Sequence, residues 1–387
     1  MSEQNPNKEK SPGYVAGMSE EELRLKYNVA EIVKIGSNEN PLGPSPRAVE
    51  AMQQAVPRLH RYPPMTDERL RGAIAASLGN GVTPDHVVTG NGACDVLSMI
   101  ADGFLGADDE CVICRPTFPV YEFLAKRNGA TVVHADLDDR DFAFNVESIL
   151  HQLGERTRIV FLCSPNNPTG TVATPEFYRE LVDFAHKHGI VIVQDAAYGA
   201  LTYDGHKPMS ILSTDGAMEV AVEVHSLSKA FNMTGWRIAF LVGSETSAKL
   251  YGTVKDNTDS GQFRAIQKAA CAALEDPSIT QRTIAKYSRR FDLLVDALRE
   301  IGFEANKPKG TFYIYVPIPK ATRSGRTFGS AEEVSEYLIK EASVSTVPWD
   351  DAGSFLRFSV TFEADLHEEE QIIHEMKERI KALDLVF

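Results

Sequence analysis

The sequence predicts an α/β fold, a mostly parallel sheet with helices on both faces. Short apolar runs alternate along the chain with amphipathic segments. In the segment 174–188, for example, Phe177, Leu181 and Ala185 recur at the spacing of one helix face. Strands that alternate with helices form βαβ units, whose helices cover a parallel sheet from both sides. With 387 residues, 43% of them hydrophobic, the chain is long enough for a large α/β unit with an appendage.

Seven apolar runs are the candidate strands of this sheet. In chain order they cover residues 87–89, 110–114, 131–134, 158–163, 189–194, 220–224 and 238–242. A glycine-containing turn at 90–92 joins the first run to a predicted helix that starts at 93–100. The sheet should therefore come from the part of the chain that ends near residue 242.

The pattern changes from about Pro277. It predicts a long helix, a strand at 311–316, a helix at 331–342, a strand at 355–360 and a terminal helix at 368–383. This order is typical of a second, smaller α+β domain. We expect a mobile tail at 1–12, a large domain at 45–276, and a small domain formed by 13–44 together with 277–387.

The net charge and the cysteine content limit which binding partners and which cellular compartment are expected. The formal net charge of −14 disfavours nucleic acid and anionic membranes as partners. The N-terminus has no apolar signal segment, and no run approaches about 18 apolar residues. Cys111 and Cys114 lie in an apolar run without a second cysteine pair, so we expect no metal site. Five cysteines without framework spacing indicate a reducing compartment, which predicts a cytoplasmic protein.

Polar residues follow several predicted strands, at the edge where doubly wound sheets bind ligands. Asn167 follows the run 158–163 in a proline-rich turn, and Asp195 follows the apolar residues of the next run. Lys229 follows the run 220–224, and Arg237 lies eight residues beyond it. Each residue alone has a simpler explanation as a turn, a helix cap or a surface charge. Their joint position at strand ends favours a functional site.

These segments resemble the class I and II aminotransferases, which are fold-type I pyridoxal-phosphate enzymes. Residues 226–237, Ser-Leu-Ser-Lys-Ala-Phe-Asn-Met-Thr-Gly-Trp-Arg, are similar to the lysine segment of that family. The order Asn-Pro-Thr-Gly, Asp-x-x-Tyr, Ser-x-Ser-Lys and Arg is also similar. Residues 37–43, 61–63 and 355–359 extend the resemblance over most of the chain. It implies a seven-stranded sheet, pyridoxal 5′-phosphate as cofactor and aminotransferase activity.

The resemblance also implies catalytic roles. Lys229 would form the Schiff base with the cofactor and then move the substrate proton. Asp195 would keep the pyridine nitrogen protonated, so that the ring accepts electrons. Asn167 and Tyr198 would donate hydrogen bonds to the ring 3′-oxygen, and Phe118 would stack on the ring.

Further residues are implied for the phosphate and for the substrate. The phosphate site would combine Ser226, Ser228 and Arg237 with the backbone N–H groups of Gly92, Ala93 and Cys94. Tyr62 resembles a tyrosine that reaches the phosphate from the neighbouring subunit, which predicts a homodimer with shared active sites. Arg357 resembles the arginine that binds the substrate α-carboxylate. Ser37 and Asn38 would line the same end of the pocket.

Two resemblances conflict on the substrate. Residues 13–17, 37–46 and 61–63 look like histidinol-phosphate aminotransferases, whereas 232–237 and 257–267 look like LL-diaminopimelate and aspartate-type enzymes. The second group lies nearer the catalytic lysine. It favours LL-diaminopimelate or an acidic amino acid, with 2-oxoglutarate and glutamate as the other pair, and Asp256 and Asp259 as groups for a distal ammonium. Histidinol phosphate, and lyase or decarboxylase chemistry such as C–S β-elimination, stay open as alternatives.

Overall fold

The computed structural model describes residues 18–64, 66–207 and 209–387. The predicted tail at 1–12 and the motif at 13–17 lie outside these residues. A seven-stranded sheet has the strand order β2-β8-β7-β6-β5-β3-β4. Its strands are β2 (Val87–Gly90), β3 (Glu110–Arg115), β4 (Thr131–Asp136), β5 (Thr157–Cys163), β6 (Val191–Asp195), β7 (Ala221–Ser226) and β8 (Ala239–Gly243). Among these seven strands only β8 runs opposite to the others, so the predicted mostly parallel α/β fold is confirmed.

Helices cover both faces of this sheet because its strands are apolar on both faces. In β3, Cys111 and Ile113 pack with α4, whereas Val112 and Cys114 pack with α7. The helices that accompany this sheet are α2 (Pro46–Ala55), α3 (Glu68–Leu78), α4 (Ala93–Phe104), α5 (Val120–Arg127), α6 (Val146–Leu150), α7 (Pro175–His188), α8 (Ala217–Val220), α9 (Leu227–Ala230), α10 (Glu245–Asp256) and α11 (Arg264–Leu274). Local signals fix some ends: the Thr174 side chain accepts from the Phe177 N–H at the start of α7.

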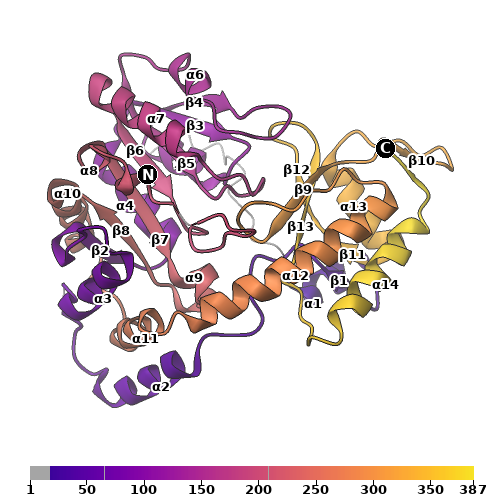
Figure 1. Ribbon diagram of the computed structural model, residues 1–387, viewed down its shortest axis with the longest axis horizontal. Coiled ribbons are helices and arrows are strands. Elements are labelled where there is room, and N and C mark those ends of the chain that lie inside the picture. The colour runs from indigo at the N-terminus through magenta and orange to yellow at the C-terminus, as the bar shows by residue number, and fades with distance from the viewer. Residues whose placement is uncertain (1–17, 65, 208) are drawn as a thin grey trace, which may run out of the picture.

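A second hydrophobic cluster forms around α12 (Ser278–Ile301), β9 (Tyr313–Pro317) and β13 (Phe355–Ser359). In Figure 1, α12 runs from beside α9 to the region of β9, β13 and α14. The remaining elements are α1 (Glu20–Tyr27), β1 (Val33–Lys34), β10 (Ala321–Thr322), α13 (Ala331–Ala342), β11 (Val344–Ser345), β12 (Val347–Trp349), α14 (Glu369–Lys381) and β14 (Leu385–Val386). The elements predicted after residue 277 are all present, within a few residues of the expected bounds.

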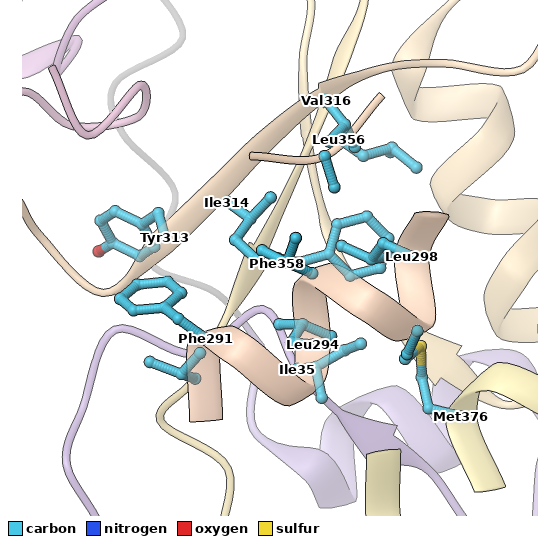
Figure 2. Close-up of a cluster of buried hydrophobic side chains, with 14 of the residues drawn as sticks. Ile35, Phe291, Leu294, Leu298, Tyr313, Ile314, Val316, Leu356, Phe358 and Met376 are labelled. Carbon is cyan, nitrogen blue, oxygen red and sulfur yellow. The ribbon is translucent and has the colours of Figure 1, made fainter. Parts of the chain in front are cut away.

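The two faces of β9 and β13 differ in what they contact. Ile314 and Phe358 point towards Leu294 and Leu298 of α12, as Figure 2 shows. The alternate residues, Arg357 among them, lie on the opposite face. The packed face anchors the two strands, and the other face is available for a site.

The predicted domain boundary between 276 and 277 falls between α11 and α12. The early segment 33–34 pairs with β11, and Leu23 of α1 packs with Ile339 of α13. The division of the chain into 45–276 and 13–44 plus 277–387 stays a prediction. Among the described residues, no helix has both the length and the apolar character needed to cross a membrane.

Candidate active site

A cavity of about 810 Å³ opens at the edge of the sheet where the parallel strands end. Residues far apart in the sequence converge there because β5, β6 and β7 run in the same direction. The predicted site residues that line it are Ser37, Asn38, Ala93, Cys94, Phe118, Asn167, Asp195, Tyr198, Ser226, Ser228, Lys229, Arg237 and Arg357. Two other predicted residues, Gly92 and Tyr62, do not line it.

Lys229 extends from α9, directly after β7, into this cavity. Its Nζ donates a hydrogen bond to the Asn38 carbonyl at 2.7 Å. Burial lowers the pKa of Lys229 to about 8, and the positive charge of Arg357 contributes to the shift. A lysine with this pKa has a far larger neutral fraction near pH 7 than an ordinary lysine, so its amine can act as a nucleophile and as a base.

Asp195, the last residue of β6, is buried with both carboxylate oxygens partnered. The Tyr121 hydroxyl donates to Oδ2 at 2.7 Å, and the Ala197 N–H donates to Oδ1 at 2.9 Å. Burial raises the pKa of Asp195, while these two hydrogen bonds oppose the shift. Tyr121 was not among the residues predicted from the sequence. It lies in the first turn of α5, three residues after Phe118, which precedes the helix, and the two rings meet edge to face. Its spacing from the predicted ring-stacking residue is the signal that could have found it.

Arg357 of β13 also lines the cavity, and no described carboxylate neutralises its charge. Its Nη1 donates to Asn167 Oδ1 at 2.7 Å, and its Cζ lies 3.9 Å from the centre of the Tyr313 ring. No described residue accepts a hydrogen bond from its Nε, and no described carboxylate forms an ion pair with it. A buried guanidinium in this state can bind a carboxylate from outside the chain.

The N-terminus of α4 and Arg237 form the third part of the cavity. A Cβ atom on Gly92 would overlap Arg237 Nη2, so a larger residue could not stand beside the guanidinium. Gly92 has φ +91°, a value that glycine adopts readily. No described residue accepts a hydrogen bond from the backbone N–H groups of Gly92, Ala93 and Cys94. Such N–H groups at a helix start, together with a guanidinium, suit an anion such as a phosphate. The Lys229 amine, the buried Asp195 carboxylate and the anion site formed by Arg237 and the N-terminus of α4 therefore fit pyridoxal phosphate.

Tyr62 lies away from this cavity in a loop, and 86% of its surface is exposed. Asp256 and Asp259 do not line the cavity either. The Asp259 carboxylate forms an ion pair with Lys255 and accepts from the Gly261 N–H at 2.8 Å. The expectation that these two aspartates face the far end of the substrate does not hold within the subunit, because Asp259 is used to fix its own loop.

The sequence matches the family model described as aminotransferase class I and II over residues 30–371. The chain belongs to the class I and II aminotransferases. It is 46% identical to an LL-diaminopimelate aminotransferase of Methanocaldococcus jannaschii, covering 78% of this chain and 74% of the relative. A second protein of that name, from Methanococcus maripaludis, is 41% identical and covers 94% of this chain and 91% of its own length.

Solved structures agree with the family. The substrate-bound BacF structure from Bacillus subtilis has a TM-score of 0.84 and 30% identity, and covers 96% of both chains. The enzymes of this family depend on pyridoxal phosphate, so this aminotransferase is a pyridoxal-phosphate enzyme. The resemblance inferred from the motifs, the fold type, the cofactor and the aminotransferase activity are confirmed.

Proposed function

We propose that this aminotransferase transfers an amino group from LL-diaminopimelate to 2-oxoglutarate, producing glutamate. The observation that carries the proposal is the mixed charge of the cavity lining outside the residues assigned to the cofactor and the α-carboxylate. This part of the lining holds the basic residues Lys26 and Lys34 and the acidic residues Glu39, Glu332, Glu336, Asp350 and Asp351. LL-diaminopimelate presents an ammonium and a carboxylate at its distal end, so groups of both signs complement it.

The alternative substrate fits this charge less well. Histidinol phosphate would bring a dianionic phosphate into a cavity where these five acidic side chains outnumber the two lysines, so the lining would repel it. The names of the two methanogen relatives also support LL-diaminopimelate.

The positions of the cavity residues support the following proposed roles. Pyridoxal phosphate, when bound, supplies a ring that takes up the electrons released at the substrate Cα. Lys229 Nζ would hold the cofactor and move the Cα proton. Asp195 would accept a hydrogen bond from the ring nitrogen, Asn167 and Tyr198 would donate to the ring 3′-oxygen, and Phe118 would stack on the ring.

The remaining residues bind the two charged ends. Ser226, Ser228 and Arg237 would hold the phosphate together with the N–H groups of Gly92, Ala93 and Cys94. Arg357 would pair with the α-carboxylate of each substrate in turn, and Ser37 and Asn38 would line that end. Since no described carboxylate neutralises Arg357, each substrate can do so in the cavity.

The substrate proposal is tested by comparing specificity constants of the purified, cofactor-loaded protein. We expect a kcat/KM for LL-diaminopimelate with 2-oxoglutarate at least tenfold above that for histidinol phosphate, about 1.4 kcal/mol in transition-state binding. The reverse order would overturn the proposal, and release of pyruvate and ammonia would indicate a lyase. As a matched control, Lys34→Met should raise the KM for LL-diaminopimelate and leave the KM for glutamate unchanged.

We also propose that the enzyme is a homodimer with shared active sites. Tyr62 is the reason, because a tyrosine so exposed in one subunit can reach the phosphate of another. Mixing inactive Lys229→Ala and inactive Tyr62→Ala subunits should restore part of the activity, since one of the two mixed sites is intact. Mixing Lys229→Ala with Arg357→Ala should restore none, because both residues serve the same site. Activity of an isolated monomer would contradict this proposal. The cytoplasmic location stays a prediction.

A further inference from the structure

Tyr313 lies between the residue assigned to the substrate carboxylate and the residue assigned to the cofactor ring. Its Oη is 2.8 Å from Tyr198 Oη. Its ring faces the guanidinium of Arg357, 3.9 Å from Cζ. All three side chains are buried, with 0%, 6% and 2% of their surface exposed for Tyr313, Tyr198 and Arg357. One residue thus contacts both halves of the site.

The register of β9 and β13 explains this contact. Arg357 lies opposite Tyr315, and Ser359 lies opposite Tyr313. Tyr313 and Arg357 are therefore diagonal neighbours on one face of an antiparallel pair, within reach for long side chains. The other face is fixed against α12 by Ile314 and Phe358 (Figure 2). The strands hold the two side chains in register before any ligand binds.

We propose that Tyr313 is a positioning residue for the amino transfer. In the hydrogen bond between Tyr313 and Tyr198, either hydroxyl can be the donor. With the cofactor bound, Tyr198 would donate to the ring 3′-oxygen, so the Tyr313 hydroxyl would donate to Tyr198 Oη, and the Tyr313 ring supports the Arg357 guanidinium. This inference rests on the roles proposed above for Tyr198 and Arg357.

The chemistry of the three groups supports this assignment. A phenol has one proton to donate, so a donor at Tyr198 Oη determines where the Tyr198 proton points. Burial raises the pKa of Tyr198 well above its usual value, so the phenol keeps that proton at neutral pH. A guanidinium over an aromatic face is stabilised without a counter-ion, which leaves its N–H groups for a substrate carboxylate.

Two variants separate the hydroxyl from the ring. Tyr313→Phe removes only the hydroxyl, whereas Tyr313→Leu removes both. Tyr287→Phe is the matched control, because Tyr287 is a fully buried tyrosine of the same hydrophobic cluster and its hydroxyl has no partner among the described residues. A general effect of removing a buried phenol would appear in all three variants.

The first measurement is the pKa given by the pH dependence of the bound cofactor's absorbance, which needs no substrate. Tyr313→Phe should raise this pKa by about 0.5 to 1, because the hydrogen bond to the 3′-oxygen weakens. Tyr198→Phe should raise it at least as much, and the double variant should match Tyr198→Phe alone. Tyr287→Phe should leave it unchanged.

The second measurement is the KM for glutamate. We expect a change within about twofold for Tyr313→Phe and an increase of about tenfold or more for Tyr313→Leu, which has lost the support of Arg357. An absorbance pKa in Tyr313→Phe equal to that of Tyr287→Phe, or additive shifts in the double variant, would overturn the inference. If Tyr198→Phe itself leaves the pKa unchanged, the role of Tyr198 fails and the inference fails with it. The absorbance measurement uses no substrate, so its result does not depend on whether LL-diaminopimelate is the substrate.

Discussion

Two buried arginines of this aminotransferase are partnered in opposite ways. Arg290 of α12 is fully buried, and its Nε donates to Glu369 Oε1 at 2.8 Å. Its other N–H groups donate to the carbonyl groups of Val360, Phe362 and Ala364, in the segment after β13. Every end of this guanidinium therefore has an acceptor, including a carboxylate that balances its charge.

Arg357 of β13 is buried to a similar degree but has no such balance. Its strongest contact is neutral, the amide oxygen of Asn167 at 2.7 Å, and its Nε has no described partner. A buried charge without a counter-ion is costly to the fold. Burial alone therefore does not distinguish a structural arginine from a binding one. The lack of a carboxylate partner does, because a substrate can supply that carboxylate.

The largest effect expected from this comparison is on stability. Arg290→Met removes the donors of a buried network and should lower the free energy of unfolding by about 3 to 5 kcal/mol. Arg289→Met is the control, since Arg289 donates to the same Glu369 carboxylate but its side chain is 44% exposed. It should cost about 1 kcal/mol or less. Urea denaturation measures both, and equal losses would contradict the comparison.

The next effect concerns catalysis at Arg357. Arg357→Lys keeps the positive charge but loses the paired N–H groups, so kcat/KM should fall about 100-fold, or about 2.7 kcal/mol. The free energy of unfolding should change by no more than about 1 kcal/mol, because the chain itself offers this guanidinium little. Steady-state kinetics and urea denaturation of the same preparation test the two statements. A loss of stability as large as that of Arg290→Met would show that Arg357 is a structural residue.

The smallest effect is a change in the pH dependence of cofactor capture. The pKa of Lys229 is lowered to about 8, first by burial and then by the charge of Arg357. Only the neutral amine attacks the cofactor aldehyde, so the capture rate should rise with pH through about 8 and then level off. Arg357→Met removes a repelling charge, and the midpoint should therefore move to higher pH. Arg290→Met should leave it in place, because Glu369 already balances that charge.

The absorbance change after mixing cofactor-free protein with pyridoxal phosphate gives these rates. An unchanged midpoint in Arg357→Met would mean that Arg357 and Lys229 do not interact across the cavity. It would also mean that the charge of Arg357, like that of Arg290, has no effect on Lys229.

The sheet was predictable because its strands are buried on both faces. An apolar run such as 158–163 needs no knowledge of its neighbours to be recognised, and Lys229 and Asp195 follow such runs directly. Helix α2 was not predicted, although Ser45 and Pro46 carry the signal for its start. Its apolar side packs on α11, a segment more than 200 residues later in the chain.

The sequence predicted the strands of the large sheet together with β9 and β13, and the residues at their ends, because both depend on local hydrophobic pattern. The short strands β1, β10, β11, β12 and β14 were not predicted. The sequence could not determine that Tyr121 bonds to Asp195, that Tyr313 supports Arg357, or that Arg357 lacks a counter-ion. These facts depend on which strands become neighbours and on the register between segments far apart in the chain. They become visible in the tertiary structure, because folding brings distant side chains together and so sets whether a buried charge has a counter-ion.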